Sequence, residues 1–170
     1  MLKSLLRERR RSSAVHALGI LGSAREASFD RFVMLAARSF DAPIALLSLI
    51  HGDTQWFKAS HGAEIVCNPR HSSFCTFALD QPDILEICDP RADPRVAHLP
   101  VVNDAPFIRY YIGVPLRVTG GIDVGALCIL DTRQRHPASP DQKAYLTALA
   151  RQASAALEGR ADLMKMGGRA

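Results

Sequence analysis

The spacing of hydrophobic residues along the chain predicts helices at both ends and pairs of neighbouring strands between them. Apolar residues recur three or four positions apart over residues 2–18 and 28–40, so each segment is expected to form an amphipathic helix. The run of residues 44–50 is almost wholly apolar, which is typical of a buried strand, and residues 55–60 alternate as its return strand. A short strand is expected over residues 84–88. Because short turns join neighbouring strands, we expect an antiparallel sheet with helices packed on its faces.

The stretch from residue 107 to residue 132 is expected to form a second hairpin, because β-branched and aromatic residues fill both of its arms. Gly120 and Gly121 can adopt the positive φ values that a tight hairpin turn requires. Gly113 and Gly125 lie inside the predicted strands, where glycine indicates a bulge or the close approach of backbone or ligand. A bend in the sheet without any ligand would explain these residues equally well.

Serine residues mark the predicted beginnings of two helices. Ser28 is expected to cap the helix of residues 29–40. Ser139 is followed by Pro140 and Gln142, which together form a capping-box pattern for a helix reaching Met166. The apolar positions of that last helix suggest a weak coiled-coil seam, although a helix facing the core explains the first half equally well: Leu146, Leu149, Ala153, Ala156 and Leu163.

Two segments lack regular hydrophobic spacing. Residues 61–71 are expected to form a loop, followed by a short helix that Ser72 or Ser73 caps and that runs to Asp80. Residues 89–106 contain four prolines and are expected to form a long excursion with one helical turn near Arg95–His98. Loops of that length inside a domain are usually functional or disordered.

The formal charge of +4 is concentrated at the N-terminus. Five of the 21 basic residues and one acidic residue lie within residues 1–11, and the remaining 16 basic residues are balanced by 16 acidic ones. A neutral globular part does not indicate a nucleic-acid-binding face, and no apolar run approaches the roughly 20 residues of a membrane span. Glu8, His16 and Gly19 interrupt what would otherwise resemble a cleaved signal. We therefore expect a cytoplasmic protein whose four cysteines are free thiols.

Segments spread over residues 28–157 resemble the GAF family of sensory domains. The resemblance rests on seven fragments in the family's order: Phe29-Asp30-Arg31 with residues 40–46, residues 55–58, Ser73-Phe74-Cys75, Asp93-Pro94-Arg95, residues 100–102, residues 108–116 and residues 125–131. It implies an α+β fold with about six antiparallel strands, flanking helices and long N- and C-terminal helices. The domain organisation expected from it is a basic helix and connector over residues 1–27, a GAF-like domain over residues 28–160 with its last helix at 139–166, and a tail over residues 161–170.

The resemblance also implies a function. Members of the family usually bind a small molecule between the sheet and the segments that cross it, here residues 61–80 and 89–108, and usually do not catalyse a reaction. They often dimerise through their terminal helices, so we expect a homodimer or a separate signalling protein as partner. The signatures of the cyclic-nucleotide-binding and bilin-binding members cannot be placed here, so no cofactor is implied.

The candidate ligand-binding residues come from the crossing segments and from the strands beneath them. Arg95 and Arg109 could hold an anionic ligand that His98 and Asp104 help to orient. The two arginines could equally pair with loop carboxylates and fix the excursion. The aromatic and thiol side chains could line an apolar pocket, or could belong to an ordinary core: Phe57, Phe74, Cys75, Phe77, Phe107, Tyr111 and Cys128.

The cysteines raise two further possibilities. Cys67, His71 and Cys75 have a spacing that metal ligands can share, but Pro69 disfavours a helix there and we expect no metal site. Cys75, Cys88 and Cys128 could form a redox group if the fold brings them together, as cysteines do in one GAF-fold enzyme, the free methionine sulfoxide reductase. Buried structural thiols are otherwise inert. The sequence thus favours a non-catalytic sensory domain, with thiol chemistry and a pure interaction module as alternatives.

Overall fold

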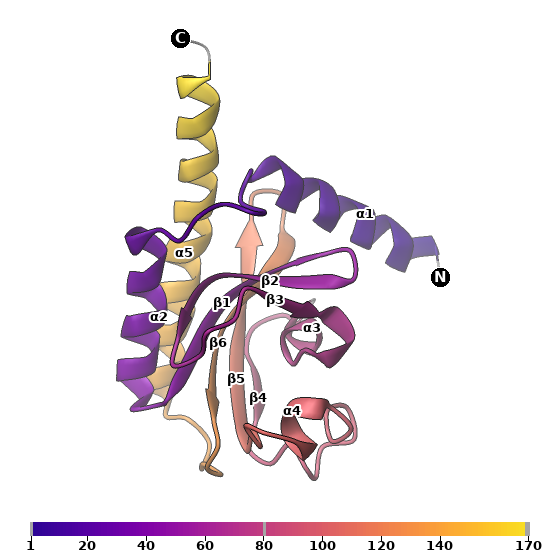
Figure 1. Ribbon diagram of the computed structural model, residues 1–170, viewed down its shortest axis with the longest axis vertical. Helices are drawn as coiled ribbons and strands as arrows, with labels where there is room; N and C mark the ends of the chain where they lie inside the picture. The colour runs from indigo at the N-terminus through magenta and orange to yellow at the C-terminus, as the bar shows by residue number, and fades with distance from the viewer. Residues whose placement is uncertain (1, 80, 169–170) are drawn as a thin grey trace.

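An antiparallel sheet forms the centre of the structure, a computed structural model that describes residues 2–79 and 81–168. Within these residues the sheet has six strands in the order β3-β2-β1-β6-β5-β4, which confirms the predicted architecture (Figure 1). The strands are β1 (Ile44–His51), β2 (Thr54–His61), β3 (Cys67–Pro69), β4 (Leu85–Ile87), β5 (Tyr110–Val118) and β6 (Ile122–Asp131). The two hairpins expected from the sequence, β1–β2 and β5–β6, therefore meet side by side through β1 and β6.

The glycines of the second hairpin explain its geometry. Gly120 and Gly121 adopt φ values of 88° and 70° in the turn, as predicted. A side chain at Gly125 would meet backbone, because its Cβ would lie 1.8 Å from the carbonyl oxygen of Ser48 on β1. A Cβ at Gly113 would instead lie 2.2 Å from the hydroxyl of Tyr111. Gly125 thus marks a close approach of backbone, whereas Gly113 makes room for a neighbouring side chain.

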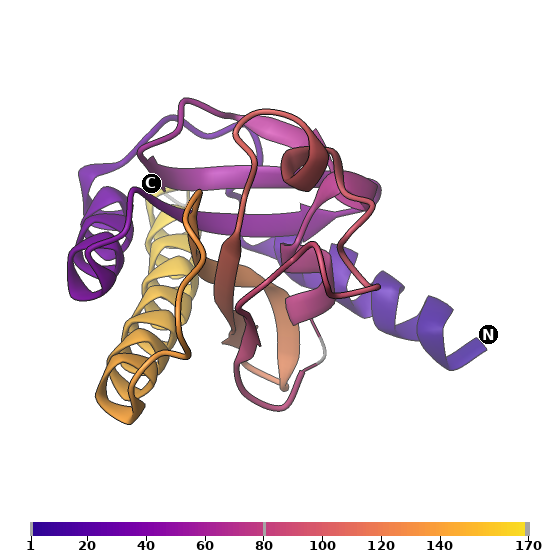
Figure 2. The same ribbon diagram turned by 90° about the horizontal axis from the view of Figure 1, so that it is seen from below.

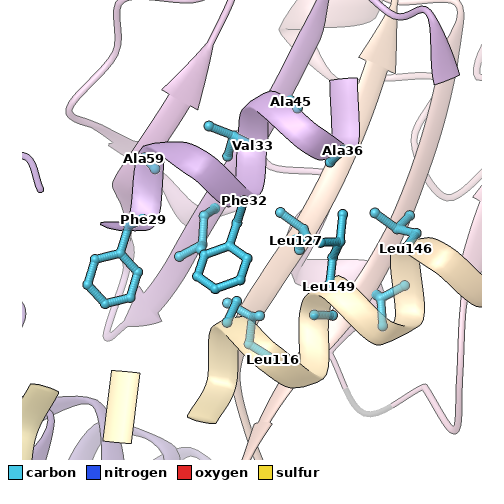
Figure 3. Close-up of a cluster of buried hydrophobic side chains, with 14 of the residues drawn as sticks. Phe29, Phe32, Val33, Ala36, Ala45, Ala59, Leu116, Leu127, Leu146 and Leu149 are labelled. Carbon is cyan, nitrogen blue, oxygen red and sulfur yellow. The ribbon is translucent and has the colours of Figure 1, made fainter. Parts of the chain in front are cut away.

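One face of the sheet is covered by α2 (Ala27–Phe40) and α5 (Pro140–Gly167), as Figure 2 shows. The side chains that the sequence placed on one face of α2 interlock with leucines of α5 and of the sheet, including Phe32, Leu127 and Leu149 (Figure 3). Burying one such side chain contributes about 1.5–3 kcal/mol relative to leaving it exposed. This cluster is the main hydrophobic core, and it fixes the strands from which the opposite face is built.

The opposite face is covered by short elements. These are the 3₁₀ turn η1 (Arg70–Ser72), α3 (Cys75–Ala78), α4 (Pro100–Asn103) and the connections between them. Their apolar side chains form a second, smaller core with the residues of β1, β5 and β6 that face away from α2 and α5. Because short elements leave much of the sheet to be covered by loops, this is the face on which a cavity can remain.

Helix α1 (Leu2–Ala17) begins away from the sheet and reaches it only with its second half (Figure 1). Leu2, Leu5 and Leu6 are all more than half exposed, whereas Val15 is fully buried. The Arg11 side chain is also buried and donates from Nε to the carbonyl oxygen of Asp123, at a distance of 2.7 Å. The apolar side chains at the start of α1 are therefore largely exposed.

The capping box predicted for the last helix is present. Ser139 Oγ accepts from the backbone N–H of Gln142, whose side chain accepts from the N–H of Ser139. The first half of the predicted apolar seam is buried against the sheet, whereas Leu163 is 71% exposed. Whether this exposed end pairs with a second copy stays a prediction.

An ionic group holds α5 to the connection before α2. Arg160 donates to Glu26 over 2.7 Å, and the same carboxylate pairs with the buried Lys58 of β2. Lys58 also donates to Ser23 Oγ and to the carbonyl oxygen of Ala24. Arg160 follows the buried part of the apolar seam of α5, and its ion pair gives this charged residue a structural role.

Local predictions were wrong in three places. The N-cap of α2 is Glu26 rather than Ser28, because the helix begins two residues earlier than expected, at Ala27. The loop expected over residues 61–71 contains strand β3, which pairs with β2 at the sheet edge. The helical element of the long excursion is α4, not residues 95–98. Asp80 at the expected end of α3, residue 1, and residues 169–170 of the expected tail lie outside the described residues.

Candidate functional site

A cavity of about 260 Å³ lies between the sheet and the elements that cross its second face. Its floor is formed by β1, β2, β5 and β6, and its walls by residues 63–75 and 101–108. Most of the lining is apolar, with Leu46 and Leu130 from the sheet and Ile65 and Ile108 from the walls. The volume exceeds the roughly 150 Å³ of a cavity that binds benzene, so the space suits a small organic molecule. Exposed Glu64 and Pro106 belong to the lining, so the cavity reaches the surface.

Two aromatic rings support the cavity beside its thiols. Phe74, which directly precedes α3, stacks on Tyr111 of β5 with ring centroids 5.0 Å apart and planes 11° from parallel. Both side chains are buried. The Tyr111 hydroxyl reaches over Gly113 and donates to Cys75 Sγ at 3.7 Å. Gly113, the glycine predicted inside β5, therefore leaves the space in which the Tyr111 hydroxyl reaches the thiol of Cys75.

Polar groups are few on this lining and one of them is unsatisfied. Asn68 of β3 contributes a buried Oδ1 that has no hydrogen-bond partner among the residues described. Leaving a buried acceptor without a donor costs about 1–3 kcal/mol. No Lys, Arg or His occurs among the described residues that line the cavity, and Glu64 is its one acid. The lining therefore favours an uncharged ligand that can donate one hydrogen bond.

Cys75 and Cys128 lie side by side in the lining. Their sulfur atoms are 3.5 Å apart, and both side chains are buried. A hydrogen bond from Cys128 lowers the pKa of the Cys75 thiol from 9.0 to about 7, with further hydrogen bonds from Ser48, Tyr111 and Gln55, although burial opposes the shift. The hydrogen bond to Cys75 and burial raise the pKa of Cys128. One sulfur of the pair is thus favoured as thiolate and the other as thiol.

Of the predicted site residues, five line this cavity and come together: Phe57, Phe74, Cys75, Tyr111 and Cys128. Phe77 packs against the second core without reaching the cavity. The other five, which belong to the excursion, also lie outside the lining: Arg95, His98, Asp104, Phe107 and Arg109.

The two arginines of the excursion bind parts of the excursion itself. Arg95 forms an ion pair with Asp93 at the surface, at a distance of 2.5 Å. Arg109 donates to the carbonyl oxygens of Val102 and Ile108, so its guanidinium fixes the backbone that forms one cavity wall. Phe107 is half exposed beneath the Arg109 guanidinium. Arg95 thus matches the alternative of pairing with a loop carboxylate, whereas Arg109 fixes the loop through carbonyl oxygens instead of a carboxylate.

The cysteine–histidine spacing does not produce a cluster. Cys67 and His71 are exposed, whereas Cys75 is buried in the cavity. Within residues 2–79 and 81–168, no three His, Cys, Asp or Glu side chains gather as metal ligands would. Cys88 lies apart from the sulfur pair, in contact with the core on the other face of the sheet.

No helix within residues 2–79 and 81–168 is long and apolar enough to cross a membrane.

Sequence reasoning missed three polar residues of the site. Asn68 was assigned to a loop, and Ser48 and Gln55 were taken only as strand residues. Ser48 interrupts an otherwise apolar strand and Gln55 opens the next one, and both are buried. A polar side chain inside a fully buried strand is a signal that something must satisfy it. Here Ser48 Oγ donates to the carbonyl oxygen of Ala126, and both Ser48 and Gln55 help to lower the pKa of Cys75.

A direct contact joins the cavity wall to α1. Arg70 of η1 binds the Glu8 carboxylate through two nitrogens, at 2.5 and 3.0 Å. Its backbone N–H donates to Asp53, and its carbonyl oxygen accepts from Thr76 of α3. Ser72 of the same turn lines the cavity. The N-terminal helix is therefore attached to a turn that forms part of the cavity wall.

Comparison with known proteins shows which protein family the sequence matches. The sequence matches the GAF domain family over residues 24–157. It is 36% identical over 144 residues to a cyclic di-GMP phosphodiesterase of Pseudomonas aeruginosa, covering 85% of this chain. The chain spans 24% of the length of that relative.

Solved structures agree on the fold. The GAF domain of a phosphoenolpyruvate-protein phosphotransferase from Coxiella burnetii superposes with a TM-score of 0.66 at 14% identity, covering 98% of this chain and 96% of that one. The type II free methionine-R-sulfoxide reductase of Thermoplasma acidophilum gives 0.62 at 14% identity, covering 90% and 96%. At such identities the likeness concerns the fold alone.

Proposed function

The chain belongs to the GAF domain family, and we propose that it is a non-catalytic regulatory domain that binds a small, largely apolar ligand in the cavity lined by Leu46, Phe74 and Asn68. The observation that carries the proposal is the cavity itself, which combines apolar walls with one unsatisfied acceptor. Concave, mostly apolar sites with a few placed polar groups are typical of small-molecule binding.

The ligand we propose is uncharged and carries one N–H or O–H group. The apolar walls favour its hydrocarbon part, and Asn68 Oδ1 would accept from its donor. This differs from the anionic ligand considered from the sequence, because the arginines that suggested an anion bind the excursion instead.

A pair of small aromatic probes tests the role of Asn68. Phenol and toluene have nearly the same shape, but only phenol carries a hydroxyl. We expect the ratio of phenol affinity to toluene affinity to fall about tenfold when Asn68 is replaced by leucine, because the buried hydroxyl then loses its acceptor at a cost of about 1.4 kcal/mol. Titrations followed by two-dimensional NMR of the labelled chain would measure both affinities.

The control is Asn68→Asp, which keeps acceptor oxygens at the same position and should keep the preference for phenol. An unchanged ratio in Asn68→Leu would show that this acceptor does not face the ligand. If neither compound binds the unaltered chain, the proposal of a ligand cavity is wrong.

We propose that α1 carries the signal out of the cavity. The Arg70–Glu8 contact links η1, and hence Ser72 in the cavity wall, to a helix whose first three leucines are more than half exposed. Ligand binding against η1 would shift this contact and with it α1. The exposed apolar side chains at the start of α1 and the end of α5 would meet the partner, a second copy or a separate signalling protein: Leu2, Leu5, Leu6, Leu163, Met164 and Met166.

The pH dependence of α1 docking tests this contact. The hydrogen bond from Arg70 lowers the pKa of Glu8 below its ordinary value of 4.5, against the opposing effect of burial and with help from the charge of Arg11. A lowered carboxyl pKa stabilises the docked helix above pH 4.5, and this contribution is lost as the pH falls through the docked pKa. We expect the amide protection of residues 2–10 to decrease in that range, measured by hydrogen exchange corrected for the intrinsic rate.

Glu8→Gln should remove this pH dependence and Arg70→Gln should reduce it, because Arg11 still pairs with Glu8; both should lower the protection already at pH 7. Arg9→Gln changes an exposed neighbour of Glu8 and serves as the control, with unaltered protection expected. Equal protection in Glu8→Gln and the parent at pH 7 would contradict a role for the contact.

A further inference from the structure

The two sulfur atoms on the cavity lining are placed for chemistry that ligand binding does not use. Cys75 begins the one-turn helix α3, and Cys128 lies in the central strand β6. They are 53 positions apart in the sequence, yet their sulfur atoms are 3.5 Å apart. A disulfide has an S–S length of about 2.05 Å, so a closure of roughly 1.5 Å would join them.

The mobile partner in such a closure would be Cys75. Cys128 belongs to a strand that is paired on both sides, with β1 and with β5. Helix α3 is four residues long and is preceded by the 3₁₀ turn η1. Residues in short elements at a loop can shift by an ångström at a lower cost than residues inside a paired sheet.

The surroundings assign different roles to the two thiols. Cys128 Sγ lies 3.5 Å from Cys75 Sγ and the Tyr111 hydroxyl donates to it at 3.7 Å, and these contacts, with Ser48 and Gln55 nearby, lower the pKa of the Cys75 thiol. The thiolate is the nucleophilic form of cysteine. Cys128 keeps its proton beside it, and this proton can leave with the sulfenic oxygen as water when Cys128 attacks as the resolving residue. A pair that served only to fill the core would not require a buried tyrosine hydroxyl directed at one of its sulfur atoms.

We propose that Cys75 and Cys128 form a reversible disulfide when a small organic hydroperoxide enters the cavity. The Cys75 thiolate attacks the terminal peroxide oxygen, the O–O bond breaks, and the alkoxide leaves and takes a proton from water. Cys75 is then a sulfenic acid. The sulfur of Cys128 attacks it, the S–O bond breaks, and water leaves with the proton of Cys128. In sum, two thiols and one hydroperoxide give one disulfide, one alcohol and one water, and a dithiol reverses the oxidation.

The cavity selects the class of oxidant. Its walls are apolar, with Phe57, Ile65 and Val101, and none of its described lining residues is basic. An organic hydroperoxide can therefore bury its hydrocarbon part while its oxygens reach Cys75. Disulfide formation does not depend on the ligand proposed above, whereas any transmission to α1 rests on the Arg70–Glu8 contact of the proposed function.

The test uses the full chain with Cys67→Ser and Cys88→Ala, so that only the proposed pair remains. After reduction and removal of the reductant, one equivalent of cumene hydroperoxide should lower the intact mass by about 2 Da, block alkylation of both thiols, and link the tryptic peptides that contain them. Dithiothreitol should restore the mass. Hydrogen peroxide should react several-fold more slowly, because it gains nothing from the apolar walls. The rate should rise through about pH 7, following ionisation of Cys75.

Variants separate the roles. Cys75→Ser should abolish the reaction, and Cys128→Ser should leave a sulfenic acid on Cys75 that dimedone traps. Tyr111→Phe should move the pH profile to higher pH, which a merely structural tyrosine would not do. Phenol binding is measured on the reduced chain before any peroxide is added, so failure of the redox proposal and failure of the ligand proposal are distinguishable. Two thiols that stay reduced at a tenfold excess of peroxide would overturn the inference.

Discussion

Replacing Gly125 with alanine should destabilise the fold by about 3 kcal/mol or more, because the added methyl group has no space. Its Cβ would lie 1.8 Å from the carbonyl oxygen and 2.7 Å from the carbonyl carbon of Ser48, and 2.8 Å from Cα of Leu49. All three are backbone atoms of β1, so no side-chain rotation can relieve the overlap. The β1–β6 pairing that joins the two hairpins would have to separate locally. Urea unfolding followed by circular dichroism would measure the loss.

The matched control is Gly159→Ala in α5. Nothing described lies within 4 Å of a Cβ at Gly159, and the residue is exposed on a helix. Alanine there should stabilise the protein by up to about 1 kcal/mol, because alanine has the higher helix propensity. A loss below 1 kcal/mol in Gly125→Ala would show that β1 and β6 can move apart more easily than the structure indicates.

The regular elements could be predicted from the sequence because their signals are long. The apolar run of β1, the helical spacing of α2 and the capping box at Ser139 each extend over a full element, and the structure confirms all three. Strand β3 gave no such signal. It has three residues, ends in Pro69 and pairs on one side only, so neither alternation nor apolar content could reveal it.

The candidate site was predictable where it belongs to the sheet or directly precedes α3. Tyr111 and Cys128 are on one face of neighbouring strands, and the motif at residues 73–75 places Phe74 and Cys75 above them. The residues of the excursion could not be assigned, because a long segment with four prolines has no periodicity that tells which side chains face inward. Arg109 illustrates this limit: its guanidinium points to carbonyl oxygens of its own loop.

The cavity connects three features that are far apart in the sequence. Asn68 is an unsatisfied acceptor at one side, the Cys75–Cys128 pair is another part of the lining, and η1 joins the wall to α1 through Arg70. An apolar ligand and an oxidant would act on the same short segment, residues 70–78. That segment is held to the sheet by side chains rather than by strand pairing. A small displacement of the segment can therefore be passed on to the N-terminal helix.

Replacing Asp131 with alanine should cost about 3 kcal/mol, because it leaves the partly buried Arg135 without its carboxylate. Asp131 is 1% exposed at the end of β6 and accepts from Arg135 Nε at 2.7 Å. Arg135 in turn donates to the carbonyl oxygens of Phe40 and Asp41, which close the C-terminus of α2. Loss of Asp131 would therefore loosen the junction between α2 and the sheet, and thermal unfolding would report it.

The pH dependence of stability gives a second readout. Burial tends to raise the pKa of Asp131, but the Arg133 backbone N–H and the Arg135 side chain outweigh it and hold that pKa below the ordinary 3.8. A lowered carboxyl pKa contributes stability above pH 3.8 that is lost as the pH falls through the folded value. Asp131→Asn should remove this part of the acid-induced loss of stability.

The chain supplies its own control, because the same local pattern occurs twice at the surface. Asp89 and Asp93 each accept from the backbone and side chain of the arginine two positions later, as Asp131 accepts from the backbone N–H of Arg133. In the excursion those arginines are about half exposed, and an exposed ion pair contributes at most about 1 kcal/mol. Asp89→Ala should therefore change stability far less than Asp131→Ala. Equal effects would mean that the turn, rather than the buried junction with Arg135, is what Asp131 stabilises.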